Sequence, residues 1–106
     1  MLYITLLCDN GMSTSMMVQR MEKCAKERGL ETDIAAISVK AMKERMAHTD
    51  VLLLGPQVRY LLSKMKAEYE PAGIAVADIP PMDYGRMNGE SVLELALKLN
   101  KERENS

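Results

Sequence analysis

The residues best suited to chemistry lie in one short stretch near the start of the chain, which is Cys-Asp-Asn-Gly-Met-Ser-Thr-Ser from Cys8 to Ser15. A cysteine thiolate is a strong nucleophile, and the hydroxyl groups that follow it can donate hydrogen bonds. A loop that leads into a helix adds unpaired backbone N–H groups and the positive end of the helix dipole. Both features favour the thiolate of Cys8 and a bound phosphate, so the stretch indicates phosphocysteine chemistry.

Two other interpretations of this stretch need less or different chemistry. A partly buried thiol in front of an ordinary Ser/Thr helix cap would have the same local spacing. A redox module would need a resolving cysteine nearby. Cys24 lies about two and a half turns further along the predicted helix, so we expect a small core residue there. One histidine and two distant cysteines make a poor zinc set, and we expect no metal or cofactor.

Composition restricts the class of protein. The chain has 106 residues, of which 47% are hydrophobic and 27% charged, and its formal net charge is −1. These values predict one globular domain over residues 1–106, with no nucleic-acid partner. No apolar run approaches the roughly 18 residues that a membrane span needs, so no membrane insertion is expected. No basic region precedes the apolar start, which argues against a signal peptide and predicts a cytoplasmic location.

The elements that must position Cys8 alternate along the chain. Buried strands are predicted at residues 2–7, 32–38, 50–54 and 74–77. Helices are predicted at 13–28, 39–47, 58–69 and 90–103, and a stiff loop at 78–85. This order predicts an α/β fold, a four-stranded parallel sheet with helices on both faces, in strand order 2-1-3-4. Ligands bind such sheets where the order switches, which would bring the Cys8 loop beside Gly55-Pro56-Gln57.

Two motifs carry a resemblance to a known family. They are the stretch from Cys8 to Ser15 and the run Val-Leu-Leu-Leu-Gly-Pro-Gln-Val-Arg-Tyr from Val51 to Tyr60, with a weaker match at Tyr84-Gly85. The chain resembles, over nearly its whole length, enzyme IIB of the phosphoenolpyruvate-dependent sugar phosphotransferase systems, in the lactose/cellobiose (diacetylchitobiose) class.

The resemblance implies a cytoplasmic phosphocarrier with a fold like that of the low-molecular-weight tyrosine phosphatases. Such a protein accepts a phosphoryl group on Cys8 from a histidine of enzyme IIA. It passes the group to a sugar held by the membrane transporter enzyme IIC, and so acts as a protein-phosphocysteine–sugar phosphotransferase. The sugar is expected to be a β-linked disaccharide such as cellobiose, diacetylchitobiose or lactose, and the sequence leaves the choice open.

Physical reasoning about this expected chemistry assigns roles to individual residues. The phosphate would be bound by the residues that follow Cys8, namely Asp9, Asn10, Gly11, Met12, Ser13, Thr14 and Ser15. Gln57 and Tyr60 would form the rim of the site, together with Tyr84. Arg59 would steer the phosphorylated partner, or would be an ordinary solvated charge on a helix.

A small cysteine-dependent phosphatase is the rival interpretation. Those enzymes use Cys-x5-Arg and an aspartic acid on a late loop, and here Thr14 stands at the arginine position. Asp83 could imitate the acid, although a turn residue is the simpler interpretation. Without a bidentate cation the transition state loses charge stabilisation, so hydrolysis of a phosphocysteine should be slow. Slow hydrolysis suits a carrier.

Overall fold

The centre of the fold is a sheet of four parallel strands. The computed structural model describes residues 1–9 and 12–105, and it describes only the backbone of Met12 and Ser13. The strands are β1 (Leu2–Cys8), β2 (Thr32–Ser38), β3 (Val51–Leu54) and β4 (Ala75–Asp78). Their order is β2-β1-β3-β4, which confirms the predicted topology. Cys8 pairs with Ser38, and Leu7 pairs with Leu54. The carboxyl ends of β1, β2 and β3 therefore meet at one edge.

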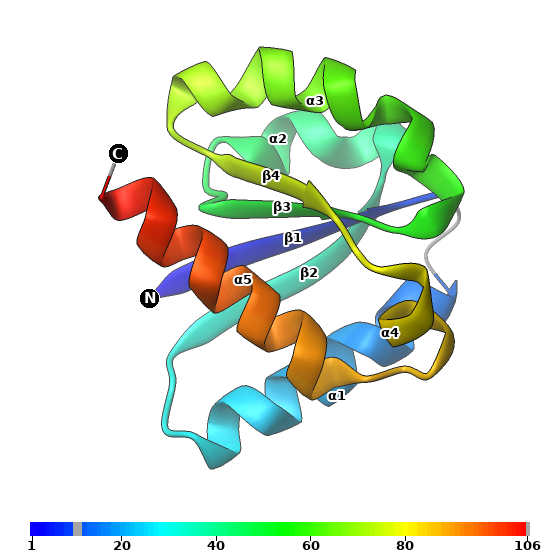
Figure 1. Cartoon of the computed structure of the whole chain (residues 1–106), viewed down its shortest axis with the longest axis vertical. Coiled ribbons are helices and arrows are strands. Elements are labelled where there is room, and N and C mark those ends of the chain that lie inside the picture. Colours follow the sequence, from blue (N-terminus) through cyan, green and yellow to red (C-terminus); the bar gives the residue numbers. More distant parts are fainter. Residues whose placement is uncertain (10–11, 106) are drawn as a thin grey trace.

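Helices cover both faces of the sheet (Figure 1). The main helices are α1 (Met12–Glu27), α2 (Met42–Met46), α3 (Leu62–Tyr69), α4 (Pro81–Gly85) and α5 (Gly89–Glu104). Short 3-10 segments are η1 (Val39–Ala41), η2 (Pro56–Leu61) and η3 (Glu70–Ala72). The single helix expected at 39–47 is divided between η1 and α2. The expected loop at 78–85 was wrong in part, because its second half is the helix α4.

Two apolar clusters hold the layers together. Successive side chains of a strand point to opposite faces. Leu6 and Leu53 accordingly lie in a cluster with residues of α1 and α5, whereas Leu7 and Leu54 lie in one with residues of α2 and α3. All four residues of β3 are buried, as expected for a strand that is covered on both sides. Much of the core volume comes from methionine, with Met17, Met21, Met42, Met46 and Met65 buried.

Arg45 of α2 links two strands at the edge of this core. Its guanidinium donates to the Thr5 hydroxyl at 3.0 Å and to the carbonyl oxygens of Ile4 at 3.2 Å and Asp33 at 2.9 Å. It also forms an ion pair with the Asp33 carboxylate at 3.1 Å, and its side chain is only 18% exposed. Hydrogen bonds to a charged, shielded group are stronger than those between neutral partners.

We therefore expect Arg45→Met to lower the free energy of unfolding by about 3 kcal/mol, because it strands several acceptors that the guanidinium now satisfies. Urea denaturation followed by circular dichroism measures this loss. Arg86→Met is the control, since that side chain is exposed, and it should change stability by less than about 0.5 kcal/mol. Equal stability of the two variants would contradict the assigned role of Arg45.

Candidate functional site

Cys8 is the last residue of β1, and the residue is 2% exposed. Its thiol donates to the carbonyl oxygen of Ile37 in β2 at 3.5 Å. The helix α1 begins four residues further along the chain, at Met12, and packs against the sheet (Figure 1). The cysteine therefore lies at the switch point of the sheet, where β1 is flanked by β2 and β3.

The helix that follows has an N-terminus suited to an anion. α1 is 16 residues long and carries no acidic side chain in its first turn. The unpaired N–H groups and the dipole of such a turn favour negative charge. Of the predicted phosphate-binding residues, Asp9 and Ser15 are exposed and Thr14 is buried. Asn10 and Gly11 lie outside the described residues, as do the side chains of Met12 and Ser13.

Thr14 is joined to two other predicted site residues. Its Oγ1 lies 3.1 Å from the hydroxyl oxygen of Tyr84, and Gln57 Nε2 donates to that same oxygen at 3.2 Å. Thr14 is 1% exposed and Tyr84 is 8% exposed. The three residues come from α1, α4 and η2, so the structure brings together segments that are far apart in sequence. Tyr84, which was expected at the rim, has a buried side chain.

The loop after β3 packs directly on the end of β1, as the strand order predicted. The Gly55 N–H donates to the Leu7 carbonyl oxygen at 2.9 Å. A Cβ atom added to Gly55 would lie 2.8 Å from Gln57 Oε1 and 3.3 Å from the Leu7 oxygen. Only glycine fits this approach without a shift of its neighbours. The backbone next to Cys8 and the Gln57 side chain therefore lie close together on either side of Gly55.

Arg59 and Tyr60 lie on the outer side of η2. The Arg59 side chain is 63% exposed and pairs with the Asp78 carboxylate at 3.2 Å, while Tyr60 is 78% exposed. Asp78 is the last residue of β4, at the same end of the sheet as Cys8. Sequence reasoning missed this partner, because nothing in the local pattern around Asp78 points to an arginine on another segment.

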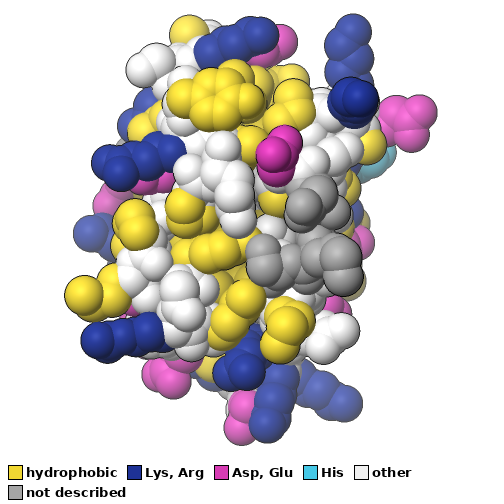
Figure 2. Space-filling model, turned by 90° about the vertical axis from the view of Figure 1, so that its right-hand side faces the viewer, with side chains coloured by type: hydrophobic (Ala, Val, Ile, Leu, Met, Phe, Trp, Pro, Cys, Tyr) yellow, Lys and Arg dark blue, Asp and Glu magenta, His cyan; other side chains and the backbone are white. Residues whose placement is uncertain are grey.

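Hydrophobic side chains gather on the face that contains the carboxyl ends of the strands (Figure 2). Large exposed ones are Met16 of α1 at 50%, Tyr60 of η2 at 78% and Met82 of α4 at 66%. Those three elements surround the end of β1, and lysine and arginine side chains lie toward the periphery of this face (Figure 2). An exposed apolar group rimmed by charge is typical of a protein-binding surface.

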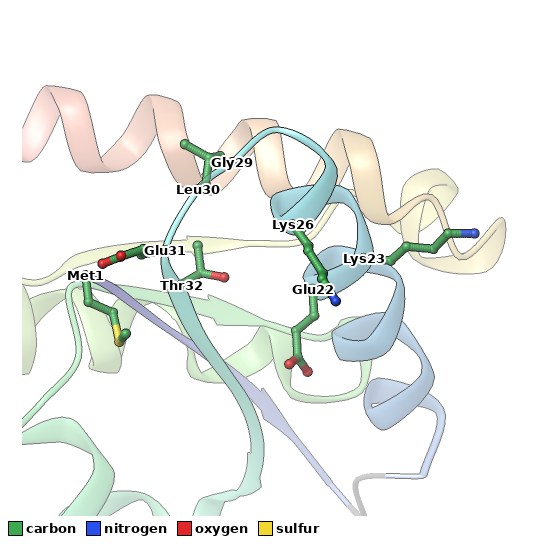
Figure 3. A pocket seen from close by; sticks show the side chains of 8 residues that line it. All are labelled: Met1, Glu22, Lys23, Lys26, Gly29, Leu30, Glu31 and Thr32. Atoms are coloured by element: carbon green, nitrogen blue, oxygen red, sulfur yellow. The ribbon is translucent and has the colours of Figure 1, made fainter.

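A separate hollow lies at the opposite end of the sheet, beside the end of α1 and the start of β2 (Figure 3). Charged residues of both signs line it, among them Glu22, Lys23, Lys26 and Glu31. It contains none of the predicted site residues. Over the part of the chain that the structure describes, no helix has the length and apolar character needed to cross a bilayer. The described His, Cys, Asp and Glu residues form no group of three that could hold a metal ion.

Comparisons with known proteins agree with this arrangement. The family model for the lactose/cellobiose-specific IIB subunit of the PTS system matches residues 3–95. The PTS galactose-specific EIIB component of Lactococcus lactis subsp. cremoris is 41% identical over an alignment of 101 residues, and the alignment covers 91% of this chain and 94% of the relative.

Solved structures extend the likeness to three dimensions. The cellobiose-specific phosphotransferase IIB component of Borrelia burgdorferi has a TM-score of 0.80 at 41% identity, over 96% of this chain and 94% of its own. A variant of the arginine phosphatase YwlE with a phosphorylated active-site serine has a TM-score of 0.56 at 15% identity, over 98% of this chain and 96% of its own. That second likeness shows a shared fold of the low-molecular-weight phosphatase type.

The family match covers both motifs that carried the resemblance, and the sheet order, the switch-point cysteine and the helix that follows it are all in place. The chain belongs to the lactose/cellobiose-specific IIB family of the PTS, whose members are sugar phosphotransferases.

Proposed function

We propose that Cys8 carries the phosphoryl group, which it accepts from a phosphohistidine of enzyme IIA and gives to a sugar bound by the membrane enzyme IIC. The observation that carries this proposal is the position of Cys8 at the carboxyl end of β1, with the N-terminus of a 16-residue helix beginning just beyond it. We place the reaction in the cytoplasm, and the sugar is a β-linked disaccharide such as cellobiose, diacetylchitobiose or lactose.

Each half-reaction is an in-line displacement at phosphorus. In the first, the Cys8 thiolate attacks, the S–P bond forms, and the P–N bond breaks with its electron pair left on the histidine of the donor. In the second, a sugar hydroxyl attacks and the O–P bond forms, while the S–P bond breaks with its electron pair left on the Cys8 thiolate. The hydroxyl proton passes to water or to a base beside the sugar. Charge develops on the phosphoryl oxygens in both steps, so catalysis depends on donors that are already in position.

The proposed phosphate cradle consists of the loop and the first turn of α1. Its members are Asp9, Asn10, Gly11, Met12, Ser13, Thr14 and Ser15, which would contribute backbone N–H groups and hydroxyls. Gln57, Arg59, Tyr60 and Tyr84 are proposed to surround this cradle. Arg59 acts at the surface, where its pairing with Asp78 leaves it 63% exposed to an approaching partner.

Both partners must reach the same sulfur in turn, so their docking surfaces overlap around the end of β1. The exposed side chains of Met16, Tyr60 and Met82 supply apolar contact there. Because a carrier has to release each partner after transfer, we expect a small interface of the size that transient complexes use.

The site favours a carrier over a phosphatase. Thr14 stands where a Cys-x5-Arg enzyme has its arginine, and it is buried against the Tyr84 hydroxyl, so the chain has no guanidinium at that position. Arg59, the arginine of η2, is paired with Asp78. These features lower the rate at which water can attack a phosphocysteine.

Mass spectrometry after phosphoryl transfer tests the proposal. We expect incubation with phosphoenolpyruvate, the general phosphotransferase proteins and a matching enzyme IIA to add a single phosphate, which peptide mapping places on Cys8. The same mixture without enzyme IIA is the control and should add none. A phosphate on His48, or none in the complete mixture, would refute the assignment.

A further inference from the structure

The start of α1 is held in position by a closed ring of contacts that returns to Cys8. From Thr14 the ring passes to the Tyr84 hydroxyl at 3.1 Å and then to Gln57 Nε2 at 3.2 Å. Gln57 packs over Gly55, whose N–H donates to the Leu7 carbonyl oxygen at 2.9 Å. Leu7 is the residue before Cys8, and the chain from Cys8 leads back to α1. The ring thus connects the start of α1 with the end of β1.

Fixed geometry at this point matters because the cradle works through its first-turn N–H groups. Donors must be held to within about 0.5 Å of the positions that transition-state charge requires. Thr14 is the third residue of α1, so contacts that hold its side chain also restrain the turn that would face the phosphate. Within this ring of contacts, the Tyr84 hydroxyl joins Gln57, which follows β3, to the first turn of α1.

The aromatic ring of Tyr84 and its hydroxyl group have separable roles. The aromatic ring belongs to the apolar cluster that includes Met17 and Ile79, which accounts for its burial. The hydroxyl oxygen adds nothing to that apolar packing, and it meets polar atoms from two other segments. Removing the oxygen alone therefore leaves the core filled and disconnects Thr14 from Gln57.

We propose that Tyr84 and Gln57 are positioning residues, which act through Thr14 to hold the start of α1 in the geometry that phosphoryl transfer needs. This role differs from contact with the phosphate or with a partner at the rim. The inference rests on the proposal that Cys8 is the phosphorylated residue.

Tyr84→Phe is the direct test. We expect the rate of transfer from phosphorylated enzyme IIA to fall about tenfold, since misplaced donors weaken transition-state stabilisation. The KM for the donor should change less than about twofold, because a buried hydroxyl does not touch the partner. Tyr69→Phe is the matched control: Tyr69 is half-buried in α3 on the other face of the sheet, and its loss of hydroxyl should leave the rate unchanged.

Coupling to Thr14 separates positioning from a general loss of stability. Thr14→Val keeps the shape of the side chain and removes its hydroxyl. If Tyr84 acts through Thr14, adding Tyr84→Phe to Thr14→Val should slow transfer by less than about twofold more, whereas independent roles would multiply the two effects. Amide hydrogen exchange supplies a readout that needs no phosphate. In Tyr84→Phe the amide of Met16, which closes the first turn of α1 on the Met12 carbonyl, should exchange about tenfold faster, while the Ala25 amide keeps its wild-type rate.

Any one of three results would overturn the inference: an unchanged transfer rate in Tyr84→Phe, multiplicative effects in the double variant, or unchanged exchange at the Met16 amide. Peptide mapping of the phosphorylated wild-type protein, done in parallel, identifies the residue that carries the phosphate. A wild type that carries its phosphate elsewhere than on Cys8 would refute the proposed function and this inference together. A wild type phosphorylated on Cys8 beside an unaffected Tyr84→Phe would refute the inference alone.

Discussion

Replacing Cys8 with serine is expected to reduce phosphoryl transfer to the sugar by about a thousandfold or more, because a serine hydroxyl is a far weaker nucleophile than a thiolate. A phosphate that did reach the serine would form a stable oxygen ester and would not be passed on. The exchange of sulfur for oxygen leaves the backbone pairing of β1 with β2 and β3 intact. The measurement is transfer of label from phosphoenolpyruvate to sugar, with far-UV circular dichroism to confirm the fold.

Cys24→Ser is the matched control for this experiment. Cys24 lies on α1, is partly exposed, and packs beside the cluster formed by α1 and α5. It should retain full transfer and lose about 1 kcal/mol of stability at most. Transfer that survives in Cys8→Ser would rule out Cys8 as the phosphorylated residue. Loss of transfer in a folded Cys24→Ser would contradict the purely structural role given to Cys24.

Gly89→Ala is expected to destabilise the fold by about 3 kcal/mol, at the upper end of what overpacking costs. Gly89 is the first residue of α5, where that helix touches α1. A Cβ atom there would lie 2.7 Å from the carbonyl carbon and the Cβ of Arg20, and 2.9 Å from the Met21 nitrogen. Backbone atoms cannot rotate away as the end of a side chain can, so the two helices would have to separate.

Gly85→Ala provides the comparison. Nothing lies within 4 Å of a Cβ atom at Gly85, the last residue of α4. Alanine there should be neutral, or stabilising by about 0.4–1 kcal/mol, because it restricts the unfolded chain. Urea denaturation of both variants measures the difference. Similar midpoints for the two alanine variants would show that α1 and α5 do not approach as closely as described.

The strands and their order could be predicted from the sequence because their signals are local and their rules general. The unbroken apolar run at Val51–Leu54 indicated a strand buried on both faces, and alternation with helices then fixed a parallel sheet. The helix α4 was missed because Pro80-Pro81 suggests a break. Proline is in fact well tolerated in the first turn of a helix, and Pro81 occupies that position.

Some features of the site could be predicted from the sequence, and others could not. Its cysteine follows a strand and precedes a helix, which is a local pattern. The contact between Thr14 and Tyr84 joins residues 70 positions apart, and the pairing of Arg59 with Asp78 likewise depends on how η2 packs beside β4. Contacts of this kind follow from tertiary packing and leave no periodic mark in the sequence. For that reason the buried position of Tyr84 became evident only in the structure.

The burial of Tyr84 also determines how the protein can be observed. The chain has no tryptophan and no phenylalanine, and its four tyrosines are its only aromatic side chains apart from one histidine. Tyr60 is exposed, Tyr3 and Tyr69 are half-buried, and Tyr84 is buried with its hydroxyl bonded to Thr14. Near-ultraviolet absorbance and fluorescence therefore come from four rings in distinct surroundings. With fluorotyrosine in place of tyrosine, fluorine NMR is expected to give a separate resonance for each of the four rings. The resonance of Tyr84 would then report on the start of α1.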